Sequence, residues 1–348
     1  MQNAIPSVRI PVFVGSRRSG AGIYSRIGPF APTLPPFPVQ KTGIIHIAQV
    51  NLGVTEMFVL IGIGVLFGAI IVGFTSEGGK IAALMQVNEF IIIGGAALGS
   101  MLIANPLSVV ISVFKGVLGT LKPSRYSKAA YMELLKMLYD MFMMARKEGL
   151  MSLDSHVERP EDSSFFSNYP LFFSNHHAVA FLADTMKVIV SGSVSDYNLM
   201  ELMDIDLETT HEEELKPSQI VAKMGDAMPG FGIVAAVLGV VNTMAAIGGK
   251  PEVIGEKVGA ALVGTFLGIL MAYGLLQPLS ISMEASSKAG GMYMNAIKFA
   301  LLSFARGDAP LTAVEFARRN IEPSVRPSFS EMEQFVKNMG GGDMAAAA

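Results

Sequence analysis

The sequence predicts an all-α polytopic membrane protein with four transmembrane helices and a helical cytoplasmic domain. Three observations support this fold class. Of the 348 residues, 51% are hydrophobic and only 16% are charged, and the mean hydropathy of +0.47 is too high for an ordinary soluble domain. Four long stretches carry no charge at all. The basic residues are sparse in two of the loops that join these stretches, as expected for loops on the outer side of a membrane.

The four uncharged stretches are each long enough to cross a bilayer, which takes roughly 17–25 apolar residues in a helix. They are residues 57–74, 90–114, 227–247 and 258–283, and the second is interrupted by Asn105 and Pro106. Because none of them carries a charged side chain, we expect any carboxylate needed for ion transport to come from a partner chain.

The distribution of Lys and Arg predicts the orientation. The stretch 115–226 contains eleven of them and the segment 284–348 contains seven, whereas the loop after the first span has only Lys80. The positive-inside rule therefore places 115–226 and both termini in the cytoplasm, with two spans in 57–114 and two in 227–283. Residues 1–56 have no acidic residue before Glu56, and we expect a disordered extension or a mis-assigned start there.

Helical periodicity organises the cytoplasmic segments. Apolar residues recur at helical spacing from Tyr131 to Ala145, in a helix expected to continue from the second span and to end at Gly149. A second helix is predicted over 177–190. Ser328, with a Glu three residues later, fits a capping box that opens a final helix. The alanine-rich tail after it is expected to be unstructured.

The composition excludes several classes of function. The chain has no cysteine, and its histidines form no pattern typical of a metal site, so we expect no cofactor and no metal. No phosphate-binding glycine loop or nucleophile motif is present, and we expect no enzymatic activity. The net charge of −3 gives no support for nucleic-acid binding.

Two prolines near the cytoplasmic ends of consecutive spans are the most informative residues inside the membrane. Pro229 cannot donate to the carbonyl of Gly225, and Pro278 leaves the carbonyl of Gly274 free. Each is expected to kink its helix. A static kink and a flexing point beside a permeation path remain equally open on this reasoning.

The same residues resemble a known family. The segments GDAMPGFGIVAAVLGVV (225–241) and LVGTFLGILMAYGLLQPL (262–279) are similar to the third and fourth spans of the MotA family of flagellar stator subunits. The similarity continues through YSKAAYMELL (126–135), ARKEGLMSLD (145–154) and RPSFSEME (326–333). It covers the chain from about residue 57 to residue 336.

The resemblance implies a function and partners. It implies a bacterial inner-membrane protein that forms a pentameric ring around MotB, whose aspartate carries the proton, and that pushes on the rotor protein FliG. Pro229 and Pro278 match the prolines that couple proton flow to movement, and Thr265 matches a threonine that faces the ion path. Arg146 and Asp154 match charged positions that interact with the rotor; many relatives have Glu at the latter.

The resemblance also bears on the ion and on alternatives. Sodium-driven relatives such as PomA have threonine seven positions after the third-span proline, where this chain has Ala236. A methyl group offers Na⁺ no oxygen ligand, so we expect proton coupling. An ExbB- or TolQ-like energising subunit is the main alternative, although those relatives usually have three spans. A secondary transporter would need charged midplane residues and inverted repeats, and neither is visible.

Overall fold

The computed structural model describes residues 55–192, 194–244 and 247–338, and these contain helices and no strand. The predictions for residues 1–54 and for the tail after residue 338 lie outside the described residues. The elements, in chain order, are α1 (Thr55–Ser76), α2 (Ile81–Leu84), α3 (Val87–Ala104), α4 (Leu107–Gly119), α5 (Lys128–Glu148), η2 (Leu150–Leu153), α6 (Asp154–Glu158), η3 (Pro160–Asp162), η4 (Phe166–Asn168), α7 (Pro170–Phe173), α8 (His176–Ser191), α9 (Asp196–Met244), α10 (Pro251–Ile269), η5 (Leu270–Leu276), α11 (Gln277–Ala305), α12 (Pro310–Asn320) and α13 (Phe329–Asn338).

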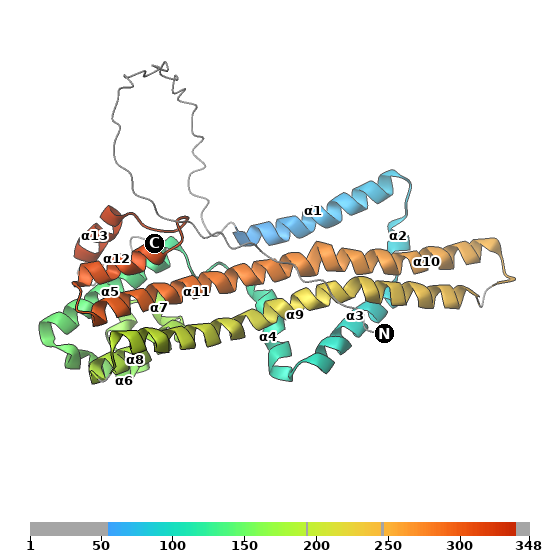
Figure 1. The fold of residues 1–348 in the computed structure, drawn as a ribbon. Coiled ribbons are helices and arrows are strands. Elements are labelled where there is room, and N and C mark those ends of the chain that lie inside the picture. Colours follow the sequence, from blue (N-terminus) through green and yellow to red (C-terminus); the bar gives the residue numbers. More distant parts are fainter. Residues whose placement is uncertain (1–54, 193, 245–246, 339–348) are drawn as a thin grey trace, which may run out of the picture. The chain divides into compact units, whose positions relative to one another are not determined.

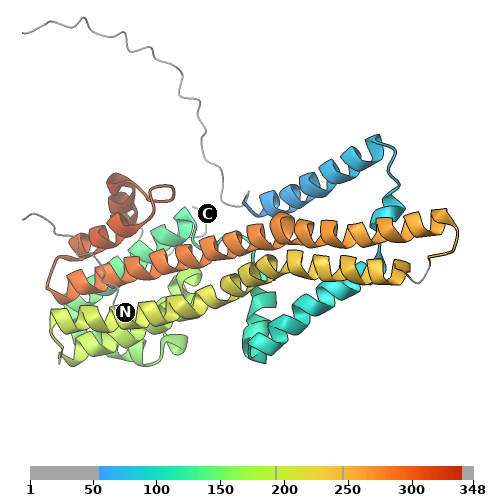
Figure 2. The same ribbon diagram turned by 45° about the vertical axis from the view of Figure 1, so that its right-hand side comes forward.

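Four helical stretches are long and apolar enough to cross a membrane, which confirms the predicted number. They lie within Phe58–Ser76, Ile81–Ala104, Asp196–Met244 and Pro251–Ala305. α9 runs beside the continuous stretch α10–η5–α11 for most of its length (Figures 1 and 2). α3 and α4 pack on α9, whereas α1 contacts mainly α2 and η5. The centre of the span region is therefore the α9–α10 pair.

The second span does not follow its predicted bounds of 90–114. α3 ends at Ala104, and Pro106 precedes a separate helix, α4. The ring of Pro106 excludes the helical conformation from Asn105, which has φ −136° and ψ 148°. The proline thus divides the apolar stretch instead of kinking it, and the span begins three residues earlier than predicted.

The expected continuity between the second span and the next helix is also wrong. α4 ends at Gly119, and α5 begins at Lys128 after Ser127, whose side chain accepts a hydrogen bond from the backbone N–H of Ala130. The Ser127 cap starts α5 as an independent helix, since it satisfies one of the N–H groups that a helix start leaves open. The predicted end of α5 is correct, because Gly149 has φ +92°.

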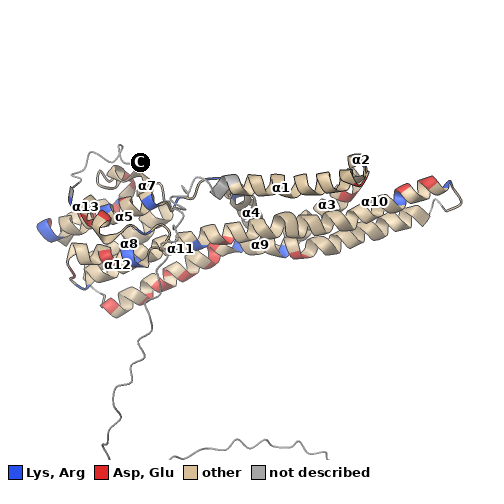
Figure 3. Cartoon of the chain, turned by 90° about the horizontal axis from the view of Figure 1, so that it is seen from above, with Lys and Arg blue, Asp and Glu red and all other residues tan. Residues whose placement is uncertain are grey.

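α9 joins two regions that the sequence presents as separate. Its N-terminal half carries eight acidic residues between Asp196 and Glu214, and its C-terminal half is the third span. Pro217 and Pro229 both lie inside this 49-residue helix. Figure 3 shows charged residues on the N-terminal half of α9 and at the α9–α10 turn, with few between them. One helix therefore connects the span region with the remaining helices.

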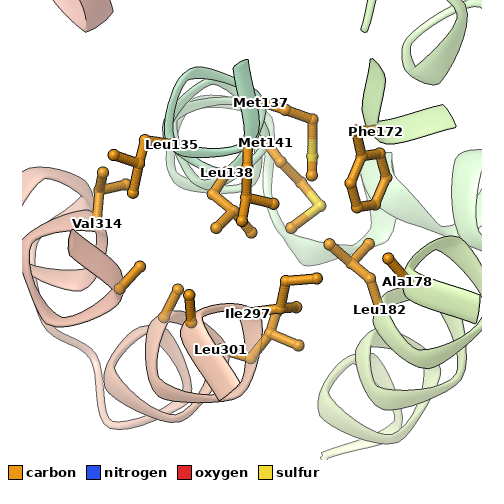
Figure 4. Packing of buried hydrophobic residues seen from close by; sticks show 14 of the residues in the cluster. Leu135, Met137, Leu138, Met141, Phe172, Ala178, Leu182, Ile297, Leu301 and Val314 are labelled. Carbon is orange, nitrogen blue, oxygen red and sulfur yellow. The ribbon is translucent and has the colours of Figure 1, made fainter. Parts of the chain in front are cut away.

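Those remaining helices form a compact unit, the helical domain, made of α5–α8, α12, α13 and the adjoining parts of α9 and α11. Its core is built from both sides of the chain. Figure 4 shows Leu138 and Met141 of α5 facing Ile297 and Leu301 of α11, with Leu182 of α8 beside them. All five are at most 1% exposed. Apolar burial of this kind is the main term that stabilises the domain.

Polar contacts fix α13 to this core. Nζ of Lys136, a nearly buried side chain, lies 2.7 Å from Oδ1 of Asp140 and 3.2 Å from the carbonyl oxygen of Val336. The hydroxyl of Tyr169 donates to the other oxygen of Asp140 at 2.6 Å. The predicted capping box is confirmed, because the N–H of Ser328 donates to Oε2 of Glu331 and the N–H of Glu331 donates to Oγ of Ser328.

Candidate functional site

The α9–α10 pair makes direct backbone contact. A methyl group added to Gly232 of α9 would lie 2.8 Å from the carbonyl oxygen of Gly264 in α10. One added to Gly268 would lie 2.7 Å from the carbonyl oxygen of Met228 and 2.9 Å from Cα of Gly232. Side chains larger than hydrogen therefore do not fit at these positions, and small residues let the two helices approach closely in a lipid environment.

The two predicted coupling prolines lie on facing helices. Gly225, whose carbonyl Pro229 cannot engage, packs against the side chains of Leu276 and Gln277. Nε2 of Gln277 donates to Oδ1 of Asp226 at 3.2 Å, and Pro278 is the next residue. The structure thus brings the turn that precedes Pro229 against the two residues that precede Pro278.

The helix before Pro278 is not simply kinked. Residues Leu270–Leu276 adopt a π-helical winding, η5, between α10 and α11. The wider turn accommodates the proline, which cannot donate a hydrogen bond to the preceding turn. π-Bulges of this kind are frequent at functional sites because they mark places where the helical ladder can shift. No periodicity in the sequence indicates this segment.

Ala236 and Thr265 lie further along the same pair. The backbone nitrogen of Ala236 is 3.2 Å from the point where a side chain on Gly264 would begin, and Thr265 is the next residue of α10. Both side chains are half-buried. Pro229, Ala236 and Thr265 therefore lie along the contact of α9 with α10, which we call the α9–α10 seam. Pro278 lies outside this seam: it belongs to α11, is exposed, and lines a cavity with α1 residues such as Phe58 and Leu66.

Arg146 and Asp154 lie outside the seam, in the helical domain. Arg146 is exposed in the last turn of α5, and Asp154 is the half-buried first residue of α6. A negative charge at a helix start and a positive charge at a helix end are both favourable. Among the described residues neither forms an ion pair. Both charges are therefore available to a partner.

Arg146 also borders a cavity of about 490 Å³. Its apolar wall includes Leu150 and Phe304, and its rim includes Asp196 and Asp308. Arg306 lies 3.7 Å from Asp196 on this rim. The described residues contain no group of three His, Asp or Glu side chains placed to hold a metal ion.

One polar residue inside the spans was missed. Glu89 lies in the first turn of α3, so the second span is not free of charged residues as predicted. Its side chain is buried, and within the described residues its Oε2 has no hydrogen-bond partner. The predicted span began at Phe90 because an uninterrupted uncharged stretch begins there. A search for spans that allowed one acidic residue in the first helical turn would have included Glu89.

Comparisons with known proteins place these features in context. Residues 60–149 match the motility protein A N-terminal family, and residues 174–293 match the MotA/TolQ/ExbB proton channel family. Motility protein A of Salmonella typhimurium and that of Escherichia coli are each 37% identical over 281 residues, which is 81% of this chain and 95% of each relative. Chemotaxis protein LafT of Vibrio parahaemolyticus is 37% identical over 77% of this chain and 94% of its own length.

Two solved structures share the fold. The structure of C. jejuni MotAB matches with a TM-score of 0.63 at 20% identity, covering 77% of this chain and 97% of that one. The flagellar MotAB stator complex from Bacillus subtilis matches with a TM-score of 0.61 at 22% identity, covering 79% and 97%. At these identities the structures establish a common arrangement of helices.

Proposed function

Because the chain belongs to the motility protein A family, we propose that it is a stator subunit of the flagellar motor, which together with MotB converts proton flow into torque. The observation that carries the proposal is the α9–α10 seam. Beside it, the turn that precedes Pro229 contacts Leu276 and Gln277, the two residues before Pro278, and Asp226 accepts a hydrogen bond from Gln277. We expect a movement at either proline to be passed to the other helix through this contact.

The proton path would lie along this seam and against MotB. The seam supplies the neutral hydroxyl of Thr265 and the methyl group of Ala236, and neither can carry a proton charge through a low-dielectric medium. An aspartate on MotB would supply the titratable group. The lack of an oxygen ligand at Ala236 favours protons over Na⁺.

Torque would leave the membrane through α9 and α11. Both helices run from the span region into the core of the helical domain, which carries Arg146 and Asp154. Rigid helices transmit a hinge movement at the prolines to these charges, which would meet complementary charges on FliG. The charges would act through a solvent-exposed contact, so we expect them to affect coupling more than stability.

The proposal also implies where the protein is located and how it assembles. α1 and the outer face of α3 expose large apolar side chains, as expected for helices that face lipid. We propose a multi-pass protein of the bacterial inner membrane, with both termini cytoplasmic, that assembles as a pentamer around MotB. It would perform no covalent chemistry.

An ExbB- or TolQ-like role in envelope transport is the alternative, because the proton channel family includes such proteins. The match of residues 60–149 to the motility protein A N-terminal family favours the flagellar role. Four candidate spans also favour it over relatives that usually have three.

A deletion and complementation experiment tests the proposal. A strain that lacks its stator subunits should lose swimming and regain it when this chain is expressed with its MotB. Swimming should persist without sodium and stop with a protonophore. Unchanged swimming after deletion, in a strain with no second stator set, would contradict the proposed function, and sodium-dependent speed would contradict the interpretation of Ala236.

Charge reversal tests the rotor contact. Arg146→Glu should reduce torque while leaving the amount of protein in the membrane unchanged, because the side chain is exposed and unpaired among the described residues. Lys147→Glu, at the neighbouring exposed position, is the matched control for the change in net charge. Equal torque in the two variants would remove Arg146 from the contact.

A further inference from the structure

Glu89 has an environment that packing alone does not explain. The residue is only 6% exposed, and its Oε2 has no hydrogen-bond partner among the described residues. It points at the α9–α10 seam, because a methyl group added to Gly264 would lie 2.7 Å from this oxygen. Because Gly264 has only a hydrogen in place of a side chain, the carboxyl group of Glu89 fits beside it.

The same point of the seam carries the predicted ion-path positions. The space beside Gly264 is also bounded by Ala235 and by the backbone nitrogen of Ala236, each 3.2 Å from a side chain that would begin there. Thr265 follows Gly264 in α10. Glu89, on α3, thus lies beside the part of the seam that contains Ala236 and Thr265.

Among the described residues, no other charged group shares this part of the span region. Residues 227–244 of α9 and 258–269 of α10 contain no acidic or basic side chain. The charged groups on the elements and loops around α3 lie outside these two stretches. They are Glu77, Lys80, Lys115, Lys223, Asp226, Lys250, Glu252, Glu256 and Lys257. Asp226 accepts from Gln277, and Lys257 donates to the carbonyl of Asn242.

An unpartnered carboxyl group at this position is costly. Ionisable residues within membrane-spanning segments are rare and mark functional sites, because a charged side chain is unfavourable in hydrocarbon. A glutamine of the same shape would remove the charge, and an apolar residue would fill the space. A group that binds and releases a proton accounts for the carboxyl chemistry, which a packing role does not require.

We propose that Glu89 is a proton-binding residue of this subunit, placed at the outer end of the proton path. This inference rests on the proposed function. The carboxylate oxygen Oε2 accepts a proton from water on the outer side, forming an O–H bond, and later releases it to water or to the carboxylate of MotB. No electrons are exchanged, and each proton that enters leaves toward the seam.

The position of Glu89 in the chain supports an outer location. α3 begins only two residues earlier, after the short connection that follows α1, and the positive-inside rule places this connection on the outer side. The α9–α10 turn, on the same side, carries Lys250 and Glu252. A proton reaching Glu89 therefore has a short way to travel from outside water.

Two substitutions separate a relay from a packing role. Glu89→Gln keeps the shape and hydrogen-bonding capacity but cannot titrate, whereas Glu89→Asp titrates but is one methylene shorter. Glu77→Gln, an exposed acid in the same connection between the first two spans, is the control. Each would be produced with MotB, and proton influx into vesicles and swimming torque would be measured at outer pH values between about 5.5 and 8.

If Glu89 relays protons, proton influx should be highest in the unaltered chain, lower in Glu89→Asp and lowest in Glu89→Gln. Glu89→Gln should lower proton influx about a hundredfold or more at the alkaline end, because a positioned proton-transfer group contributes about 10²–10⁴-fold. The deficit should shrink as outer pH falls, because protons become abundant. If Glu89 only fills space, proton influx in Glu89→Gln should equal that of the unaltered chain and influx in Glu89→Asp should be the lowest. That result would overturn the inference.

The outcome is distinguishable from failure of the proposed function. If the unaltered chain with MotB conducts no protons and gives no torque, the stator assignment fails first. If it conducts and Glu89→Gln conducts equally at every pH, only the role of Glu89 is wrong. If Glu89→Gln does not assemble with MotB, the comparison of Glu with Asp decides: a relay predicts a deficit in Glu89→Asp that grows toward alkaline outer pH, whereas a packing defect predicts the same fractional loss of influx at every pH.

Discussion

The backbone contact between α9 and α10 makes a quantitative prediction for Gly232→Ala. The added methyl group would lie 2.8 Å from the carbonyl oxygen of Gly264, which is backbone and cannot rotate away. Ordinary van der Waals contact begins at 3.4 Å. The two helices must therefore separate locally by about 0.6 Å, with loss of the close contacts on either side.

The expected cost is that of overpacking, about 1–3 kcal/mol. Gly232→Ala should lower the melting temperature of the purified complex by several degrees and reduce torque, because the methyl group separates α9 from α10 next to Pro229. Gly230→Ala is the matched control. It lies two residues away in the same helix, and a methyl group there meets nothing within 4 Å in this chain.

A second glycine sharpens the test. Gly268→Ala places a methyl group 2.7 Å from the carbonyl oxygen of Met228 and should be at least as destabilising. The double variant should cost less than the sum of the single variants, since the first separation makes room for the second methyl group. Equal melting temperatures and torque for Gly232→Ala and Gly230→Ala would refute the close packing on which this reasoning depends.

Three further predictions concern other parts of the chain. Pro278→Ala should leave membrane insertion intact but lower torque, because it restores an N–H donor and allows the π-helical turn to close; unchanged torque would exclude the proline from coupling. Ser328→Ala should destabilise α13 by about 1 kcal/mol in thermal unfolding. The N–H of Ser328 holds the pKa of Glu331 below its usual value of 4.5, so the contribution of this carboxylate should be present above that pH and be lost as pH falls, and a pH-independent α13 would contradict the cap. Lys136→Met should destabilise the helical domain by about 1–3 kcal/mol, since Asp140 loses its buried cation. A stability equal to that of the unaltered chain would show that the ion pair contributes nothing to the free energy of unfolding.

The sequence predicted the features that depend on local chemistry. The helix end at Gly149 follows from a positive φ angle that glycine adopts readily, and the capping box follows from two side chains three residues apart. The number of spans follows from apolar length. These features need no knowledge of the partner helices.

The features that the sequence did not predict depend on tertiary contacts. Pro217 and Pro229 would end an isolated helix, but α9 continues through both because α10 and α11 pack along it. η5 directly precedes the turn of Pro278, whose missing N–H it accommodates, and no periodicity encodes it. Glu89 was excluded from its span because a charge was taken as a boundary, whereas the glycine on the facing helix makes room for it.

The way the helical domain is divided along the chain affects its synthesis. Its core joins Leu138 and Phe142 to Ile297 and Leu301, and the whole α9–α10 hairpin lies between them in the sequence. The growing polypeptide must therefore insert its last two spans before this core can close. Until then the apolar face of α5 is exposed to water and to chaperones and proteases. A chain truncated before α11 would have crossed the membrane but could not close the apolar core of its helical domain. Its exposed apolar face would mark the subunit as incomplete for chaperones and proteases before it joins a motor.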